Sequence, residues 1–330
     1  MSLNGTLLLN RSNISSLLNM KEYIDVVEQA FELHSKGNIL KSGLLHFDSD
    51  EGEFHIKAGG LRLEKLYFCS KSNSGFFNNK IKYGLPNIQG LIILCDGEKG
   101  TPLALFDSID ITIKRTGAAT AVAAKYLARS DSKTITICGC GTEGRIQLRA
   151  LNEVMPLEKV FAIDSNPQNL QDFIRDMSDQ LGISILPGTL KESVLQSDIC
   201  VTCTPSKSYF LKNEYIPKGA FVAAVGADSP DKNELEPTVL SENKVVADIL
   251  EQCISVGEIH HAISAGLMAA ENVYGEIGEI IAGEKPGRIS NDEIIVYDAT
   301  GTALQDTAAA VAIYKKALNS NVGTWFKFPK

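Results

Sequence analysis

Three glycines at positions 139, 141 and 144 stand close together in "TITICGCGTEGRIQLRA", residues 134–150. An apolar, β-branched run precedes the glycines, and a helical pattern follows them. Glycines permit a tight turn and a close backbone approach to a phosphate, and the amides at the start of the following helix bind the anion. The context therefore indicates a dinucleotide site. The alternative is a plain turn, because this glycine motif alone is weak evidence.

Asp164 ends a second apolar run, "KVFAID", twenty residues after Gly144. An acid at this spacing accepts hydrogen bonds from a ribose 2′-hydroxyl. The same carboxylate would repel a 2′-phosphate, and the following Ser165 and Asn166 bring no arginine to offset it. The sequence therefore favours NAD(H) over NADP(H). The residues expected to bind the cofactor here are Gly139, Gly141, Thr142, Glu143, Gly144, Asp164 and Ser165.

Alternating strand and helix patterns position this loop. An alanine-rich helix is expected over residues 116–128, and strand patterns then alternate with helical ones, at "TITICG", "KVFAID", "ISILP", "SDICVTCT", "AFVAAVGAD" and "KVVADI". Such alternation is typical of a parallel sheet with helices on both faces. The fold class expected is α/β, with a Rossmann-type doubly wound sheet over residues 116–304.

The rest of the chain has a different pattern. An amphipathic helix is expected from Met20 to about Ser35, and short strands at "EFHIKAGGL", "LYFCSKSN" and "GLIILCDG" indicate a mixed or antiparallel sheet. A closing helix is expected over residues 305–318. We therefore predict a second, α+β domain built from residues 1–115 and 305–330.

Composition excludes some classes of partner. The chain has 330 residues and a net charge of −8, which argues against binding to nucleic acid or to an anionic membrane. No apolar run reaches the roughly 18 residues that span a bilayer. The seven cysteines are read as small buried residues, although Cys200 and Cys203 have the spacing of a redox or zinc half-site. We expect a reduced, cytoplasmic protein.

Several ordered motifs resemble the ornithine cyclodeaminase/mu-crystallin family over nearly the whole chain. They are "GEKGTPLALFDS", "IDITIKRTGAATAVAAKYLA", the glycine loop, "AVGADSPDKNEL", "IGEIIAGEKPGR" and "DATGTALQDTAAA". The resemblance implies a homodimer whose substrate domain is built from both chain ends. It also implies chemistry at the α-carbon of an amino acid or of its imine.

Individual residues match the family one at a time. Arg115 stands where the family arginine binds the substrate carboxylate, a role that suits a guanidinium fork. Lys71 matches the family lysine beside that carboxylate and the reacting carbon, and Lys41 matches a further basic residue more loosely. Asp228 matches the aspartate that acts as acid or base on the substrate amine. Each has a plainer alternative: a helix-start arginine, two solvated lysines and a turn-capping aspartate.

Further matches are weaker. Glu234 matches a family acid with a structural role. Thr204, Asp298, Thr300 and Gly301 are expected near the cofactor, although each is also typical of turns.

His55, a candidate substrate-binding residue, departs from the family pattern. Ornithine cyclodeaminases have a glutamate at this position, which can face the distal ammonium of the substrate. Here His55 occupies the position, with Lys57 two residues after it and Glu53 two residues before it. This departure puts ornithine itself in doubt and leaves the α-carbon chemistry intact. His46, His260 and His261 show no metal-ligand spacing, and no metal site is expected.

Three outcomes stay open from the sequence. The enzyme converts ornithine to proline and ammonia, or it reduces a cyclic imine such as pyrroline-2-carboxylate, or it is an alanine-type dehydrogenase. A non-catalytic protein that binds NAD(P)H or a small ligand, like some mu-crystallins, is the alternative. The sequence does not fix the substrate side chain, the preferred direction or the pathway.

Overall fold

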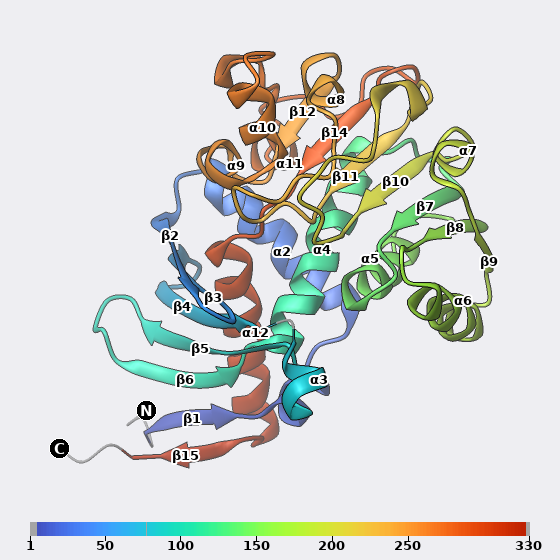
Figure 1. Cartoon of the computed structure of the whole chain (residues 1–330). Coiled ribbons are helices and arrows are strands. Elements are labelled where there is room, and N and C mark those ends of the chain that lie inside the picture. The colour runs from blue at the N-terminus through green and yellow to red at the C-terminus, as the bar shows by residue number, and fades with distance from the viewer. Residues whose placement is uncertain (1–4, 77, 328–330) are drawn as a thin grey trace. The chain divides into compact units, whose positions relative to one another are not determined.

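The computed structural model describes residues 5–76 and 78–327 (Figure 1). The chain divides into two units: unit 1 is Met1–Arg115 with Thr302–Lys330, and unit 2 is Thr116–Gly301. The second boundary lies three residues before the one expected at 304/305. The reason is that the closing helix begins at Ala303 and lies wholly in unit 1.

Unit 2 contains an eight-stranded sheet among the described residues, in the order β13-β12-β14-β11-β10-β7-β8-β9. All its strand pairs are parallel. Its strands are β7 Thr134–Cys138, β8 Lys159–Ile163, β9 Ser184–Pro187, β10 Ile199–Thr202, β11 Phe221–Ala224, β12 Lys244–Ala247, β13 Gly275–Glu276 and β14 Ile295–Asp298. The strand order reverses between β7 and β10, as in a doubly wound Rossmann-type sheet.

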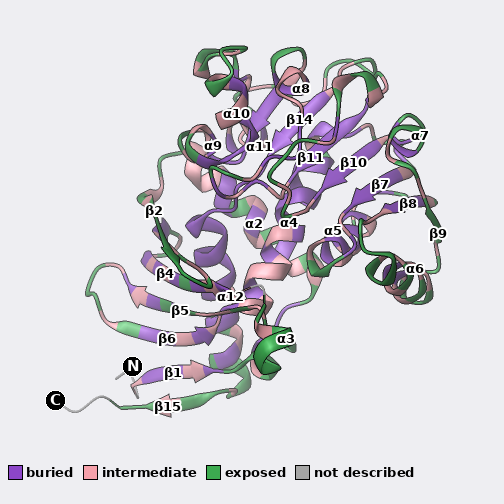
Figure 2. Cartoon of the chain, viewed as in Figure 1, coloured by how far each residue is buried: buried purple, intermediate pink, exposed green. Residues whose placement is uncertain are grey.

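Helices cover this sheet, and its central strands are buried (Figure 2). On one face Val222, Val245 and Val296 pack in a core with Leu240 and Ile259 of the covering helices. The helices of unit 2 are α5 Thr142–Asn152, α6 Pro167–Leu181, α7 Leu190–Val194, α8 Pro237–Ser241, α9 Leu250–Val256, α10 Glu258–Ser264 and α11 Ile277–Ile281, with short 3-10 turns at Asn213–Tyr215 and Ala270–Asn272.

Unit 1 contains a seven-stranded sheet among the described residues, in the order β15-β1-β6-β5-β4-β3-β2. Its strands are β1 Thr6–Leu9, β2 Ile39–Ser49, β3 Gly52–Arg62, β4 Leu66–Gly75, β5 Ile88–Asp96, β6 Pro102–Asp107 and β15 Thr324–Phe326. Both chain ends contribute, because β1 pairs with β15. Its helices are α1 Arg11–Ser15, α2 Met20–Ser35, α3 Asn79–Tyr83 and α12 Ala303–Ser320.

Helix α12 packs on one face of this sheet, against β3 and β4, and also against α2. The expected helix at Met20–Ser35 is present as α2, and a capping box between Asn19 and Glu22 fixes its start. No helix in residues 5–76 and 78–327 is long and apolar enough to cross a membrane.

Helix α4 spans Ile109–Leu127 and begins seven residues before the expected start at 116. The first turn holds β-branched residues of low helix propensity, but Ile111 is fully buried, and packing outweighs propensity here. The Asp107 carboxylate also accepts a hydrogen bond from the Ile109 amide, at 3.0 Å. Arg115 therefore lies within a helix rather than at its start.

Candidate active site

Arg115 and Lys71 converge on one buried carboxylate in unit 1. Lys71 Nζ lies 2.7 Å from Oδ2 of Asp306, and Arg115 Nε donates to Oδ1 of the same residue at 3.1 Å. Arg115 Nη1 also donates to Gln305 Oε1 at 2.9 Å. Lys71 is 3% exposed, Arg115 5% and Asp306 0%. Strand β4 and helices α4 and α12 thus bring together two sequence-predicted residues.

Burial sets the charge state of this cluster. Desolvation lowers the pKa of Lys71 to about 8, with Arg115 and Lys57 acting in the same direction and Asp306 opposing them. For Asp306, desolvation works against ionisation, but the charges of Lys71 and Arg115 outweigh it and lower the pKa of the carboxyl. Asp306 is therefore an anion that holds two cations in place.

Lys57 and Asp306 are functional candidates that the sequence did not single out. Lys57 lies directly opposite Lys71 in the β3–β4 register and is 6% exposed. Asp306 lies in the motif "DATGTALQDTAAA". The sequence hinted at its importance because it places a charged residue in an alanine-rich helix. A buried charge in such a helix needs a partner of opposite sign, which is a clue to the cluster.

Lys41 and His55 lie on the same sheet but outside this cluster. The β2–β3 register shifts between Leu40 and Gly43, so that Lys41 and Ser42 together oppose Gly59, as in a β-bulge. Lys41 is exposed there. His55 lies two residues before Lys57 on β3 and so shares its face of the sheet.

In unit 2, the glycine loop links β7 to α5 as expected. Gly139 has φ +105°, and a Cβ there would lie 2.7 Å from the carbonyl oxygen of Cys203. A Cβ on Gly144 would lie 2.0 Å from the carbonyl oxygen of Gly139. Both positions therefore require glycine for close packing. Thr142 and Glu143 form the first turn of α5.

Gly141 is different, and it faces open space. It is the N-cap residue of α5, and a Cβ added to it would meet no atom within 4 Å. The first amides of α5 thus border a place where an anion fits without displacing a side chain. These residues could hold the pyrophosphate of a dinucleotide.

Asp164 follows β8 beside this loop. Its Oδ2 accepts from the Cys140 amide at 2.7 Å, and its Oδ1 accepts from the Asn166 amide at 2.7 Å. Ser165 is exposed next to it. Backbone amides thus hold the carboxylate at the carboxyl end of β8, next to the strand that carries the glycine loop.

Thr204 follows β10, the strand on the other side of β7, so it lies at the point where the strand order reverses. Its amide and its Oγ1 both donate to Glu234 Oε1, at 2.6 and 2.7 Å. Glu234 Oε2 accepts from the Gly226 amide at 2.9 Å. Glu234 is fully buried and ties two loops at this edge of the sheet together, which is the structural role that the resemblance implies.

Asp228 lies in the loop after β11 that Glu234 anchors through Gly226. Its Oδ1 lies 2.6 Å from Lys232 Nζ. The carboxylate stands at the carboxyl edge of the parallel sheet, where ligands of such folds bind.

Asp298, Thr300 and Gly301 form a buried network with Asp248. The Thr300 and Gly301 amides donate to Asp248 Oδ2 at 2.9 and 2.8 Å, and the Ile259 amide donates to Asp298 Oδ2 at 2.9 Å. Burial, with a smaller contribution from the charge of Asp248, raises the pKa of Asp298 to about 7. These groups shape the loop after β14, and direct cofactor contact remains a prediction for them.

The cysteines lie mainly in the core. All seven are free, and five are buried, including Cys138, Cys200 and Cys253. Cys200 and Cys203 are therefore better described as packing residues than as half of a metal or redox site.

Comparison with known proteins identifies the relatives of this chain. The profile of the ornithine cyclodeaminase/mu-crystallin family matches residues 4–321. The chain is 38% identical to an alanine dehydrogenase of Archaeoglobus fulgidus over 324 residues, which cover 98% of each chain. An archaeal alanine dehydrogenase dimer with bound NAD has a TM-score of 0.93 at 38% identity, over 98% of this chain and 99% of that one. A Δ1-pyrroline-2-carboxylate reductase of Thermococcus litoralis, in complex with NADH and L-proline, has a TM-score of 0.91 at 34% identity, over 97% and 99%.

Proposed function

The chain belongs to the ornithine cyclodeaminase/mu-crystallin family, and from this membership we propose an NAD(H)-dependent enzyme acting at the α-carbon of an amino acid or of its imine. The observation that carries the proposal is the buried cluster of Lys71, Arg115 and Asp306. Burying such a cluster costs desolvation free energy, and a pair of cations held by one aspartate is suited to a carboxylate ligand.

In this proposal Arg115 and Lys71 bind the α-carboxylate of the substrate. Asp228 moves the proton at the substrate nitrogen. The glycine loop, the first turn of α5, Asp164 and Thr204 hold the dinucleotide, with Asp164 favouring NAD(H) over NADP(H). When bound there, the dinucleotide would supply or accept a hydride at the α-carbon of a substrate that Arg115 and Lys71 orient.

We propose an imino acid as the substrate, either a cyclic one or one formed from a 2-oxo acid and ammonia. Two relatives support this choice, since they are a pyrroline-2-carboxylate reductase and an alanine dehydrogenase. His55 supports it as well, because its Nε2 lies 3.2 Å from Glu53 Oε1, and a glutamate paired in this way is a poor partner for a second substrate ammonium. Ornithine cyclodeamination is the second candidate, because the family includes it.

The test measures NADH oxidation with Δ1-pyrroline-2-carboxylate and with pyruvate plus ammonium. A parallel assay measures proline and ammonia formed from ornithine with catalytic NAD⁺. We expect turnover in at least one of the first two assays. Saturable NADH binding without turnover of any substrate would instead identify a binding protein.

Asp228→Asn separates the proposed proton transfer from cofactor binding. This variant should lose turnover while its dissociation constant for NADH stays unchanged. Unchanged turnover would exclude Asp228 as the acid or base.

Arg115→Ala tests the carboxylate contact. Charge-assisted hydrogen bonds contribute about 1.5–3 kcal/mol each, so kcat/KM for a carboxylate substrate should fall about 10- to 100-fold. Arg115→Lys keeps the charge without the fork and should recover part of the loss. The dissociation constant for NADH is the control in both variants, and normal kcat/KM in Arg115→Ala would refute the role.

We also propose a homodimer in the cytoplasm. The free cysteines suit a reducing compartment. The homodimer is supported by a separate observation, an exposed apolar face of the sheet in unit 1.

A further inference from the structure

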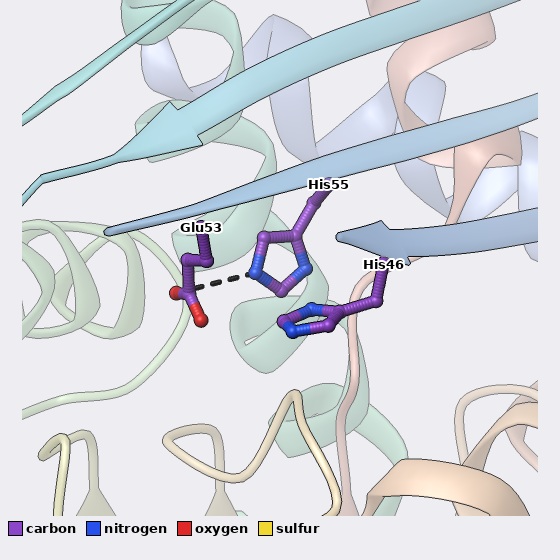
Figure 3. A group of neighbouring side chains, drawn as sticks. All are labelled: His46, Glu53 and His55. Atoms are coloured by element: carbon purple, nitrogen blue, oxygen red, sulfur yellow. Dashed lines mark ion pairs between the residues drawn. The ribbon is translucent and has the colours of Figure 1, made fainter. Parts of the chain in front are cut away.

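The hairpin of β2 and β3 carries a cluster of metal-ligating side chains. His46, Glu53 and His55 each offer one ligand atom, and these atoms lie within 4.8 Å of one another (Figure 3). His46 is exposed, and the other two are half-buried. They come from two adjacent strands and point toward one another (Figure 3).

Strand register explains why they meet. His46 pairs directly with His55 across the hairpin, and Asp48 pairs with Glu53. Side chains two residues apart on a strand share a face, and directly opposite residues lie side by side. The hairpin therefore places two imidazoles and two carboxylates on one face, although the four residues are spread over ten positions of the sequence.

The distances fit a metal site with little rearrangement. His55 Nε2 lies 3.2 Å from Glu53 Oε1, close to the edge of about 3.4 Å between ligands in a tetrahedral zinc site. The rings of His46 and His55 lie 4.6 Å apart and nearly perpendicular, so a small rotation of the exposed His46 ring brings its nitrogen nearer the other two ligands.

We propose that His46, Glu53 and His55 bind one divalent transition-metal ion of the zinc class. Two imidazoles and one carboxylate form a known zinc donor set, which leaves a fourth position for water or another ligand. Magnesium and calcium prefer all-oxygen sites, so the imidazoles select against them.

Asp48 supports the site from outside. Its Oδ1 lies 2.9 Å from Nε2 of His46. A carboxylate on one ring nitrogen orients a histidine that uses its other nitrogen for the metal. His55 and Glu53 bind the ion in their deprotonated forms, because ligating imidazoles and carboxylates must be deprotonated.

The experiment uses the untagged chain of 330 residues, treated with a chelator and then titrated with zinc chloride by calorimetry. We expect one zinc per chain. His46→Gln and His55→Gln should each weaken binding by about 100-fold or more, and Asp48→Asn by about 10- to 100-fold, as for outer-shell partners of metal sites. Asp50→Asn is the matched control, because it removes an exposed carboxylate from the same hairpin and should leave zinc affinity unchanged.

Binding of NADH and the thermal midpoint are measured on every variant, so that loss of the fold is not mistaken for loss of the site. The test is separate from that of the proposed reaction, because it reads zinc stoichiometry rather than turnover. No saturable binding at one zinc per chain would overturn the proposal. Equal zinc affinity in wild type, His46→Gln and His55→Gln would overturn it as well.

Discussion

Asp306 controls the charge of Lys71. Without a counter-ion, burial would drive this lysine toward its neutral form, and a neutral amine is a poor ligand for a carboxylate. The 2.7 Å ion pair partly offsets that effect and leaves the pKa of Lys71 at about 8. We regard Asp306 as a positioning residue that works through Lys71 and Arg115.

A pH profile follows from this arrangement. Since the pKa of Lys71 is lowered to about 8, the side chain is cationic below that pH and neutral above it. The carboxylate contact is thus present at lower pH and is lost as pH rises. We expect kcat/KM for a carboxylate substrate, which reports the free enzyme, to fall above about pH 8. The dissociation constant for NADH should not follow the same curve.

Two variants test the assignment to Lys71. Asp306→Asn removes the charge that raises the pKa of Lys71, so the fall in kcat/KM should begin at lower pH. Lys71→Arg remains cationic throughout and should abolish the fall, which keeps the test decisive if the asparagine variant folds poorly. Glu98→Gln, an exposed change in the same unit, should behave as wild type. An unchanged profile in Lys71→Arg would show that another group titrates.

The sequence revealed the individual site residues unevenly. Arg115 stood in a motif that the family shares and Lys71 matched the family lysine, so the resemblance alone brought them forward. Lys57 and Asp306 were not singled out, because their roles come from neighbours far away in the chain, although Asp306 left a weak signal as a charge in an alanine-rich helix. Asp306 meets Arg115 across 191 positions. No spacing rule covers such a pair.

At the scale of elements, the glycine loop offers a matched pair of substitutions. In Gly144→Ala the new methyl would lie 2.0 Å from the Gly139 carbonyl oxygen. It should therefore destabilise the protein by about 1–3 kcal/mol, as overpacking does. In Gly141→Ala the methyl meets open space at φ −78°, so the fold should be unaffected.

The Gly141→Ala and Gly144→Ala variants should also differ in their affinity for NADH. Gly141 faces the expected pyrophosphate, so its methyl should raise the dissociation constant for NADH about tenfold or more, a cost near 1.4 kcal/mol. Urea unfolding and NADH titration of both variants provide the measurements. A Gly141→Ala variant with normal NADH affinity would place the pyrophosphate elsewhere.

Asp298, the last residue of β14, should make the free energy of unfolding depend on pH. The pKa of Asp298 is raised to about 7 by burial, whereas an aspartate in the unfolded chain titrates near 3.9. The folded state therefore binds the proton more tightly, and its stabilising effect is lost as pH rises from about 4 through about 7. Asp248 and Glu258 shift in the same direction, also by burial first.

Asp298→Asn removes one of these titrations. The decline in unfolding free energy between about pH 5 and pH 8 should be shallower in this variant than in wild type. Circular dichroism during urea unfolding measures it at each pH. Asp131→Asn, an exposed change in unit 2, should keep the wild-type slope, and a wild-type slope in Asp298→Asn would contradict the assignment.

The sequence predicted the helices and strands better than it predicted which residues they bring into contact. The strand and helix patterns of unit 2 were visible because each element has its own periodicity, and spacing alone brought Asp164 forward, whose contact with the ribose stays a prediction. The first turn of α4 was missed because its β-branched residues are held helical by burial of Ile111. His46 meets His55 because the turn at residues 50–51 sets the hairpin register, whereas the placement of Lys41 depends on the bulge between Leu40 and Gly43. A bulge of this kind has no reliable sequence signal.

At the scale of the whole molecule, the two faces of the unit 1 sheet differ. One face packs under α12 and holds the buried cations. The other exposes large apolar side chains, whose register places them on a single face: Leu45, Phe47, Phe54, Leu91 and Ile93. Isolated apolar residues on a surface are ordinary, but a contiguous apolar face indicates an interaction site. A relative of known structure is a dimer.

We expect this apolar face to join two copies of the chain. Light scattering after size exclusion should give the mass of a dimer for wild type. Phe47→Glu, at a position 52% exposed, and Leu91→Glu should each give monomers, because they would place two carboxylates in an apolar interface. Ile289→Glu is the control, since Ile289 is 71% exposed but lies in unit 2, and it should remain dimeric. Dimers that persist in both Phe47→Glu and Leu91→Glu would show that the chain associates through another surface.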